Sequence, residues 1–229
     1  MTMPYPDACI IVFLKAPVEG QVKTRLSTDI GAPIATRLYR YMAHHCIATA
    51  VESELCPVQL WSGSTPAHEF YDDLQQQYSV PLYPQQGDDL GQRMFHALST
   101  ALESHRYAVI VGTDCPELTR NDFERALHRL QEGDDAVIAP ALDGGYVMLG
   151  LGKIDAELFQ DIHWSSTSVY VDTKSRLDQL GYHYTVLPAH RDIDQLADVL
   201  DLQQQAPRLK LSHALVSVLN HIASSARRV

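Results

Sequence analysis

Three cationic side chains gather around a glycine in the segment KAPVEGQVKTRL, which directly follows the apolar run ACIIVFL. Lys15, Lys23 and Arg25 flank Gly20. Phosphate binds where glycine lets backbone amides approach its oxygens and where Lys and Arg neutralise their charge. Polar loops after strands also occur without any ligand, so this segment is either a phosphate-binding loop or a solvated surface loop. The patterns GxxxxGK[ST] and GxGxxG are absent, so neither standard phosphate loop applies.

A carboxylate ends a second apolar run, YAVIVGTD, just before Pro116 breaks the chain. In this position Asp114 can hold Mg²⁺ or Mn²⁺, which prefer hard oxygen ligands and can bridge phosphate oxygens. An isolated Asp at a strand end can equally cap the turn. Ligands of open α/β sheets bind beyond the carboxyl ends of the strands. We therefore expect the loop from Lys15 to Arg25 and Asp114 to share one sheet edge.

The elements that must position these residues alternate between strand and helix. ACIIVFL is continuously apolar, as expected of a strand covered on both faces. A helix is expected from Thr28 onward, with Ser27, Thr28 or Asp29 as its N-cap. Thr119 is the expected cap of a helix that closes at Gly133. Further strands are expected at 57–63, 80–84, 107–114, 135–141 and 182–188, and further helices at 68–77, 90–105, 118–131, 155–162 and 168–180, with an amphipathic tail helix from 206 onward.

Gly144 and Gly145 can supply the positive φ angles of a tight turn before the segment YVMLGL. We expect this segment to form a strand, and the turn allows it to run antiparallel to its neighbours. The overall β/α alternation predicts a doubly wound α/β sandwich. No repeat or linker marks a boundary, so a single domain over residues 1–229 is expected.

Composition limits the partners. The chain has 229 residues, of which 45% are hydrophobic, and a formal net charge of -10. Such a charge disfavours nucleic acid and anionic lipid, so the expected partners are small molecules. The run ACIIVFL is too short to span a membrane, and Asp7 precedes it instead of a basic segment. The four cysteines show no paired spacing, which suits reduced thiols and a cytoplasmic location.

Several motifs resemble a known family when they are taken together and in order. KAPVEGQVKTRL, GDDLGQRM, VGTDCPEL, PALDGGYVMLGL, IHWSST and the late DID resemble the bacterial glycosyltransferase-like proteins of the nucleotide-diphospho-sugar transferase superfamily, which are related to phospholactate guanylyltransferases and molybdenum-cofactor nucleotidyltransferases. The resemblance implies a GT-A-like, Rossmann-like three-layer α/β/α sandwich with a mostly parallel mixed sheet. It also implies a nucleotide donor and Mg²⁺ or Mn²⁺.

The resemblance also implies roles for individual residues. The implied catalytic residues are Lys23, Arg25 and Asp114, and the implied metal ligands are Asp114 and Asp194, with Asp192 as the alternative to Asp194. The implied nucleotide-binding residues are Lys15, Gly20, Lys23, Thr24, Arg25, Gly87, Leu90, Gly91, Arg93 and Thr113. The implied acceptor-binding residues are Asp143, Gly144, Gly145, Tyr146 and Trp164.

Each of these motifs also has a purely structural interpretation. GDDLGQRM can be a helix N-terminus capped by Asp88 or Asp89. DGG can be a hairpin turn, and Trp164 can be a core aromatic. The segment DIDQLADVLDL departs from the family pattern, because it lacks the Thr-Pro and the Glu-Asp that usually follow the acidic residue.

Two reactions share this machinery. The first is glycosyl transfer from a nucleotide-diphospho-sugar to a small acceptor. The second is nucleotidyl transfer from a nucleoside triphosphate, which releases pyrophosphate. The first is suggested by the resemblance over most of the chain, and the second by the lone Asp114 where many glycosyltransferases carry a DxD pair. A non-catalytic nucleotide-binding module is a third possibility.

Overall fold

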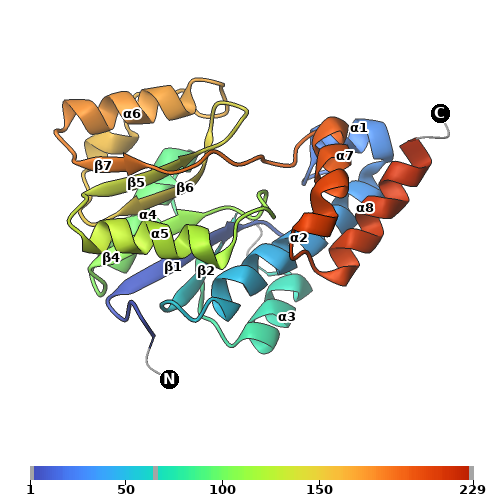
Figure 1. The fold of residues 1–229 in the computed structure, drawn as a ribbon, viewed down its shortest axis with the longest axis horizontal. Coiled ribbons are helices and arrows are strands. Elements are labelled where there is room, and N and C mark those ends of the chain that lie inside the picture. The colour runs from blue at the N-terminus through green and yellow to red at the C-terminus, as the bar shows by residue number, and fades with distance from the viewer. Residues whose placement is uncertain (1–2, 64–66, 227–229) are drawn as a thin grey trace.

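A computed structural model describes residues 3–63 and 67–226 (Figure 1). Its centre is a seven-stranded sheet in the order β3-β2-β1-β4-β6-β5-β7. The strands are β1 Ala8–Leu14, β2 Val58–Ser62, β3 Leu82–Pro84, β4 Tyr107–Val111, β5 Ala136–Pro140, β6 Tyr146–Leu151 and β7 Tyr184–Val186. β6 runs antiparallel to β4 and β5, whereas the other neighbouring strands pair in parallel. The predicted mostly parallel mixed sheet is confirmed.

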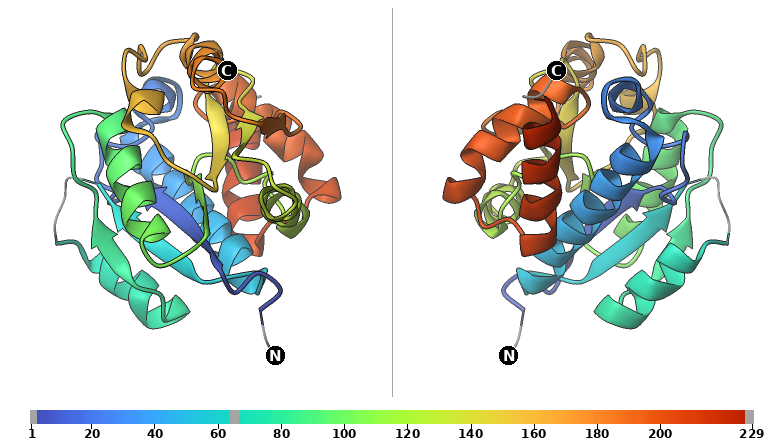
Figure 2. Two further views of the ribbon diagram at one scale, coloured as in Figure 1. Left: turned by 90° about the vertical axis from the view of Figure 1, so that its left-hand side faces the viewer. Right: turned by 90° about the vertical axis from the view of Figure 1, so that its right-hand side faces the viewer.

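Helices cover both faces of this sheet (Figure 2). The helices are α1 Thr24–Ile30, α2 Ala32–Glu52, α3 Glu69–Tyr78, α4 Leu90–Leu102, α5 Arg120–Gln131, α6 Val169–Gln179, α7 Leu196–Gln205 and α8 His213–Ala226, with short 3-10 helices at Ala156–Phe159 and Ala206–Arg208. Ile10 and Val12 of β1 pack in the core that includes α2, α3 and α5. Cys9 and Ile11, which point the other way, pack in the core that includes α4 and α6. This alternation explains why β1 is apolar at every position.

A third core lies beyond the sheet. Buried Leu26 of α1, Leu38 of α2, Val199 of α7 and Leu219 of α8 belong to it. Figure 1 shows this helical group at one side of the sheet. The long helix α2 therefore contributes one side to the sheet core and another side to the helical group.

The strand order places a topological switch point between β1 and β4. From β1 the chain adds β2 and β3 on one side, and it then returns to add β4 on the other side. Crossover connections diverge at such a point and leave a crevice beyond the carboxyl ends of the two strands, where open α/β folds bind ligands.

The expected start of the first long helix is wrong. The chain turns into α1 at Thr24, and Gly31, with φ of 82°, separates α1 from α2. The hydroxyls of Ser27 and Thr28 donate to backbone carbonyls of the preceding turn and therefore cap no helix start. Asp29 likewise lies within α1. Gly31 adopts a positive φ angle, so the chain can change direction between α1 and α2. The spacing of apolar residues predicts that this stretch is helical but does not show where one helix ends and the next begins.

Two further expectations need correction. Only Ala156–Phe159, within the predicted helix 155–162, is helical, and it is a 3-10 turn. The tail helix begins at His213 instead of 206, and α7 was not predicted from the sequence. By contrast, Thr119 forms the expected cap of α5, as a capping box with Asp122. Within the two described ranges, none of the helices combines the length and apolar composition that a bilayer crossing requires.

Candidate functional site

A cavity of about 830 Å³ opens at the switch point. Its floor is the carboxyl end of β1 and β4, with Leu14 and Val111 among its lining residues. The loop after β1, the start of α4, the turn before β6 and the segment after β7 form its walls. Sites of small-molecule ligands commonly have this size and this place in the fold.

Lys23 and Asp114 meet at this cavity. The Nζ atom of Lys23 lies 2.6 Å from Oδ1 of Asp114, and only 5% of the Lys23 side chain is exposed. Lys23 has φ of 48°, a left-handed conformation that a non-glycine residue adopts at a cost of about 1 kcal/mol or more. The loop after β1 thus turns sharply to direct its cation at the β4 carboxylate. The two residues lie at one sheet edge, as expected from their strands.

Tyr39 fixes the base of both segments. Its hydroxyl accepts a hydrogen bond from the backbone N–H of Lys15 at 2.8 Å and donates to the Lys15 carbonyl at 3.1 Å. The Thr113 hydroxyl donates to the same Tyr39 oxygen at 3.3 Å. Tyr39 is buried on α2, and burial raises the pKa of its hydroxyl, so it remains a neutral phenol. It therefore holds the ends of β1 and β4 at a fixed spacing.

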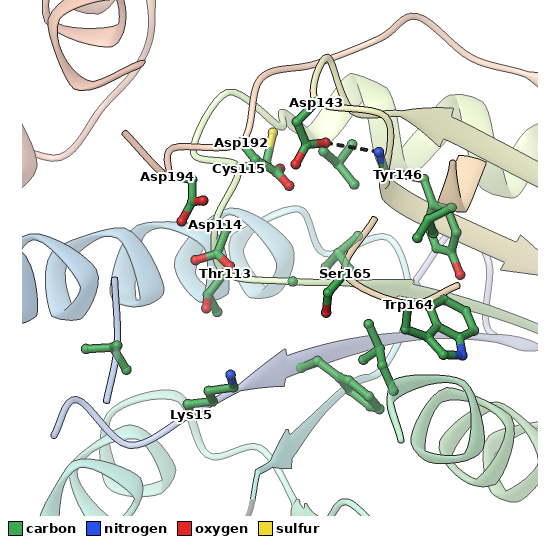
Figure 3. Close-up of a pocket in the computed structure, with 18 of the residues that line it drawn as sticks. Lys15, Thr113, Asp114, Cys115, Asp143, Tyr146, Trp164, Ser165, Asp192 and Asp194 are labelled. Carbon is green, nitrogen blue, oxygen red and sulfur yellow. Dashed lines mark hydrogen bonds between the residues drawn. The ribbon is translucent and has the colours of Figure 1, made fainter. Parts of the chain in front are cut away.

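Three further carboxylates lie above Asp114 in Figure 3. Asp114, Asp143, Asp192 and Asp194 all line the cavity. Burial, followed by repulsion from Asp114 and Asp143, raises the pKa of Asp192 to about 7, with Lys23 acting in the opposite direction. The backbone N–H of Ile193 donates to the Asp114 carbonyl at 2.9 Å, which ties this segment to β4. The neighbouring carboxylates thus destabilise the charged form of Asp192.

This chemistry fits a divalent cation only in part. Oδ1 of Asp114 is buried and accepts no hydrogen bond within residues 3–63 and 67–226, although it contacts Lys23. In the same ranges, no group of three or more His, Cys, Asp or Glu side chains is close enough to hold a metal by itself. Mg²⁺ commonly takes one or two carboxylates and completes its shell with substrate phosphates and water. The residues therefore suit a cation that arrives with a phosphate, with Asp114 and either Asp192 or Asp194 as its protein ligands.

An aromatic wall closes the opposite side of the cavity. Trp164 lies against Gly91 of α4, where a Cβ atom would come within 2.6 Å of the indole ring. Gly91 is therefore needed for the close approach of the ring to the helix. Leu90, an exposed apolar residue, and Met94 of the same helix also line the cavity. Trp164 is half-buried, because it packs against the core and also faces the cavity. It is therefore partly the core aromatic and partly the cavity residue that the sequence allowed.

The turn before β6 packs against, and is hydrogen-bonded to, the segment that follows Trp164. Asp143 accepts a hydrogen bond from the Gly145 backbone N–H at 3.0 Å. Gly144 has φ of 98°, and a Cβ atom there would collide with the Thr167 carbonyl. The N–H of Tyr170 donates to the Gly144 carbonyl at 2.9 Å. The DGG motif is thus a turn, as one interpretation has it, and it also presents Asp143 to the cavity.

The GDDLGQRM segment forms the start of α4. Asp89 is the N-cap and accepts from the Gln92 backbone N–H at 2.8 Å. Arg93 bends back and donates from Nε to the Gly87 carbonyl at 2.9 Å. Gly87 has φ of 133°, and a side chain there would meet Gln92. Gly87 does not line the cavity. Its conformation places the carbonyl that accepts the hydrogen bond from Arg93.

The structure brings most of the predicted site residues together. The cavity is lined by Lys15, Lys23, Thr24, Arg25, Leu90, Arg93, Thr113, Asp114, Asp143, Gly145, Tyr146, Trp164 and Asp194. Gly20, Gly87, Gly91 and Gly144 are outside that lining and act through the shape of the backbone. The cavity is also lined by residues that were not predicted from the sequence: Tyr39, Gln85, Met94 and the hydroxyl-bearing residues 165–167. Asp192, predicted only as the alternative to Asp194, lines it as well. The sequence signal that could have identified Tyr39 is a residue with a polar hydroxyl beside the apolar positions of the helix that follows the cationic loop.

The same fold occurs in solved structures. A protein from Desulfovibrio desulfuricans G20, provisionally described as a nucleotide-diphospho-sugar transferase, has 26% identity and a TM-score of 0.89, with 97% of this chain and 98% of that chain covered. A cytidylyltransferase from Leptospira borgpetersenii has 11% identity and a TM-score of 0.57, with 97% and 96% covered. The 4-diphosphocytidyl-2C-methyl-D-erythritol synthase of Anaerococcus prevotii has 9% identity and a TM-score of 0.58, with 89% and 99% covered. These similarities confirm the predicted fold class.

No curated protein matches the chain. Residues 46–166, which run from α2 through β4 and the DGG turn to the Trp164 loop, match the family model DUF2064, described as an uncharacterized protein conserved in bacteria. This stretch includes Asp114, Asp143 and Trp164 of the cavity and more than half of the chain. The protein therefore belongs to the DUF2064 family.

Proposed function

We propose that the cavity binds a nucleotide-diphospho-sugar together with Mg²⁺ or Mn²⁺ and transfers the sugar to a small acceptor. The observation that carries this proposal is the contact between buried Lys23 and Asp114 at the switch point of the sheet. A cation and a carboxylate at this place suit a diphosphate and its metal ion. The similarity to the Desulfovibrio protein supports a nucleotide-sugar donor.

The chain's own residues would stabilise the leaving nucleotide. Lys23 and Arg25 supply fixed positive charge beside the diphosphate, and this preorganised charge needs no rearrangement during the reaction. When bound, the metal would neutralise phosphate oxygens as a Lewis acid. Asp114 and either Asp192 or Asp194 would hold it. Lys15 and Arg93 would contact the phosphates or ribose at the rim.

One observation favours nucleotidyl transfer as the second candidate. Asp114 is a lone carboxylate at the end of β4, and Pro116 stands where a DxD arrangement would place the second acidic residue. In this alternative a nucleoside triphosphate would bind at the same place, a phosphorylated acceptor would attack its α-phosphate, and pyrophosphate would leave. The same cations would serve either leaving group.

Thermal unfolding with a panel of ligands tests donor binding. Nucleoside triphosphates and nucleotide-diphospho-sugars would be compared, each with and without Mg²⁺ or Mn²⁺. A ligand at about 100 times its Kd should raise the free energy of unfolding by about 2.7 kcal/mol. Turnover with the best ligand then separates the two reactions, because release of a nucleoside diphosphate indicates glycosyl transfer and release of pyrophosphate indicates nucleotidyl transfer.

Two matched lysine variants sharpen the test. Lys23→Gln removes the cation beside Asp114, and Lys153→Gln removes the cation that lies 2.9 Å from Asp135 at the other edge of the sheet. We expect Lys23→Gln to weaken donor binding at least about tenfold, since each 1.4 kcal/mol is a factor of ten. Lys153→Gln should leave it unchanged. Equal effects of both variants, or no binding of any nucleotide, would contradict the proposal, whereas binding without turnover would support the non-catalytic module.

A further inference from the structure

The cations that line the cavity are engaged away from Asp143. Lys23 contacts Asp114, and Arg25 contacts Asp194 with 2.8 Å between Nη1 and Oδ2. Arg93 is engaged with the Gly87 carbonyl. The Lys15 side chain leans toward β2, since its Cγ atom lies 3.4 Å from the place of a Cβ atom at Gly63. None of these cations forms an ion pair with Asp143.

Asp143 lines the cavity and has no cationic partner. Within residues 3–63 and 67–226 it forms no ion pair with Lys, Arg or His. The nearby Arg191 is turned away, with its guanidinium 3.3 Å from both Asp198 and Asp201. His190 is likewise directed to Asp122. Figure 3 shows Asp143 and Asp192 above the cavity and Lys15 below them.

The surface between these carboxylates and α4 is aromatic and hydroxylated. Trp164 presents part of its indole ring, and Ser165, Ser166 and Thr167 follow it along the cavity wall. Ser165 has φ of 66°, and its side chain lies between Asp114 and Trp164 in the close-up (Figure 3). An aromatic plane, hydroxyls and carboxylate acceptors together match a ring with apolar faces and hydroxyl groups at its edge.

We infer that the acceptor is a neutral, hydroxyl-bearing ring that carries no phosphate or carboxylate. This inference rests on the proposed function, and it narrows the acceptor for that same site. The ring would stack on Trp164 and donate hydroxyl hydrogens to Asp143. A phosphorylated acceptor would bring its charge to Asp143, which has no cationic partner, and juxtaposed like charges at a binding site are strongly unfavourable.

The transfer is balanced without a further reactant. An acceptor hydroxyl oxygen forms a bond to the anomeric carbon of the donor sugar, and the bond from that carbon to the diphosphate oxygen breaks. The nucleoside diphosphate leaves with the electron pair, and the hydroxyl proton passes to water. The charge pattern accordingly favours glycosyl transfer over transfer of a nucleotide to a phosphate group.

Paired acceptors test the inference. The full-length protein would be given its best donor and metal with glucose or glucose 6-phosphate, mannose or mannose 6-phosphate, and myo-inositol or myo-inositol 1-phosphate. Donor consumption and product mass would be measured. We expect at least one neutral member to react at least about tenfold faster than its phosphorylated partner, since a tenfold ratio needs only about 1.4 kcal/mol of discrimination.

A variant separates charge from shape. Asp143→Asn keeps the oxygen that accepts from the Gly145 N–H but removes the charge. This variant should lower the ratio of the rate with a neutral acceptor to the rate with its phosphorylated partner. It should not change the affinity for the donor. A preference for the phosphorylated members, or no reaction with any of the six compounds, would overturn the inference. Failure of the donor to bind in calorimetry would instead contradict the proposed function, so the two failures are distinguishable.

Discussion

Two groups of acidic residues lie at opposite ends of the sheet, and they differ in how completely their hydrogen-bonding and ion-pairing capacity is used. Asp134, just before β5, has a side chain that is 2% exposed; it accepts from Nε of Arg129 at 3.0 Å and from Nη2 at 3.2 Å, and it lies 2.8 Å from Nδ1 of His183. Asp114, just after β4, has Lys23 as its one cationic contact in the described ranges. The carboxylate of the first group is fully paired within the protein. The carboxylate of the second has one cationic contact and can accept further bonds from a ligand or a metal ion.

The same contrast appears between the carboxyl groups of Asp122 and Asp192. Burial alone would raise the pKa of Asp122, but hydrogen bonds from His190 and Thr119 outweigh it and lower the pKa to about 2. Burial and neighbouring carboxylates raise the pKa of Asp192 to about 7. Charge is stabilised at Asp122 and destabilised at Asp192. A cavity residue such as Asp192, whose charged form is destabilised by neighbouring carboxylates, indicates a functional site more strongly than a buried residue alone does.

The largest expected effect comes from Asp114→Asn. We expect metal-dependent nucleotide binding and turnover to fall by at least about 100-fold, because an amide lacks the charge that a divalent cation needs. The free energy of unfolding should stay near that of the wild type, since the lost contact with Lys23 is offset by weaker repulsion of Asp192. Calorimetry with and without Mg²⁺, together with urea unfolding, measures both. Retained Mg²⁺-dependent binding would make Asp114 a turn residue only.

The features that could be predicted from sequence are local. β1 is recognisable because each of its faces meets a separate core, and α5 is recognisable because its capping box lies within four consecutive residues. Lys23 and Asp114 could be expected at one edge because each follows an apolar strand. That inference needs only the rule that parallel strands end on the same side.

What could not be predicted depends on contacts between distant segments. Tyr39 reaches Lys15 from 24 residues away and Thr113 from 74 residues away. The positions of α1 and α7 follow from the third core, which no single helical pattern encodes. The packing of Trp164 on Gly91 likewise joins segments that the sequence shows only separately. Such contacts decide which members of a motif reach the cavity and which only shape its walls.

A second variant tests the structural side of the comparison. Asp134→Ala should lower the free energy of unfolding by about 2 to 3 kcal/mol, because it leaves Arg129 and His183 without their shared acceptor. Donor binding should not change, since Asp134 lies at the amino end of β5. Urea unfolding and calorimetry on the same preparation would check this. A large loss of donor affinity in a folded variant would remove the distinction between the two groups.

A pH-dependent effect is expected at Asp122. Its folded pKa of about 2 lies below the usual value, so its stabilisation is present above about pH 4 and disappears as the pH falls toward 2. Asp122→Asn should therefore cost about 2 kcal/mol at pH 5 and much less near pH 2.5. Urea midpoints at the two pH values measure it. Glu124→Gln on the same helix is the control, because its exposed pair with Arg120 should contribute less than about 0.5 kcal/mol at either pH.

The smallest effect should come from Arg25→Ala, and it separates binding from folding at a single exposed side chain. Arg25 is 68% exposed and pairs with Asp194, so the loss of this ion pair should change the free energy of unfolding by less than about 1 kcal/mol. If its guanidinium meets phosphate, donor affinity should fall about tenfold, as expected for a charge-assisted contact of about 1.4 kcal/mol. Arg40→Ala is the matched control, since Arg40 also forms an exposed ion pair, with 3.0 Å between Nη2 and Oδ2 of Asp73, away from the cavity. Equal donor affinity in the two variants would assign Arg25 to the surface and leave Lys23 as the cation on which the donor side depends.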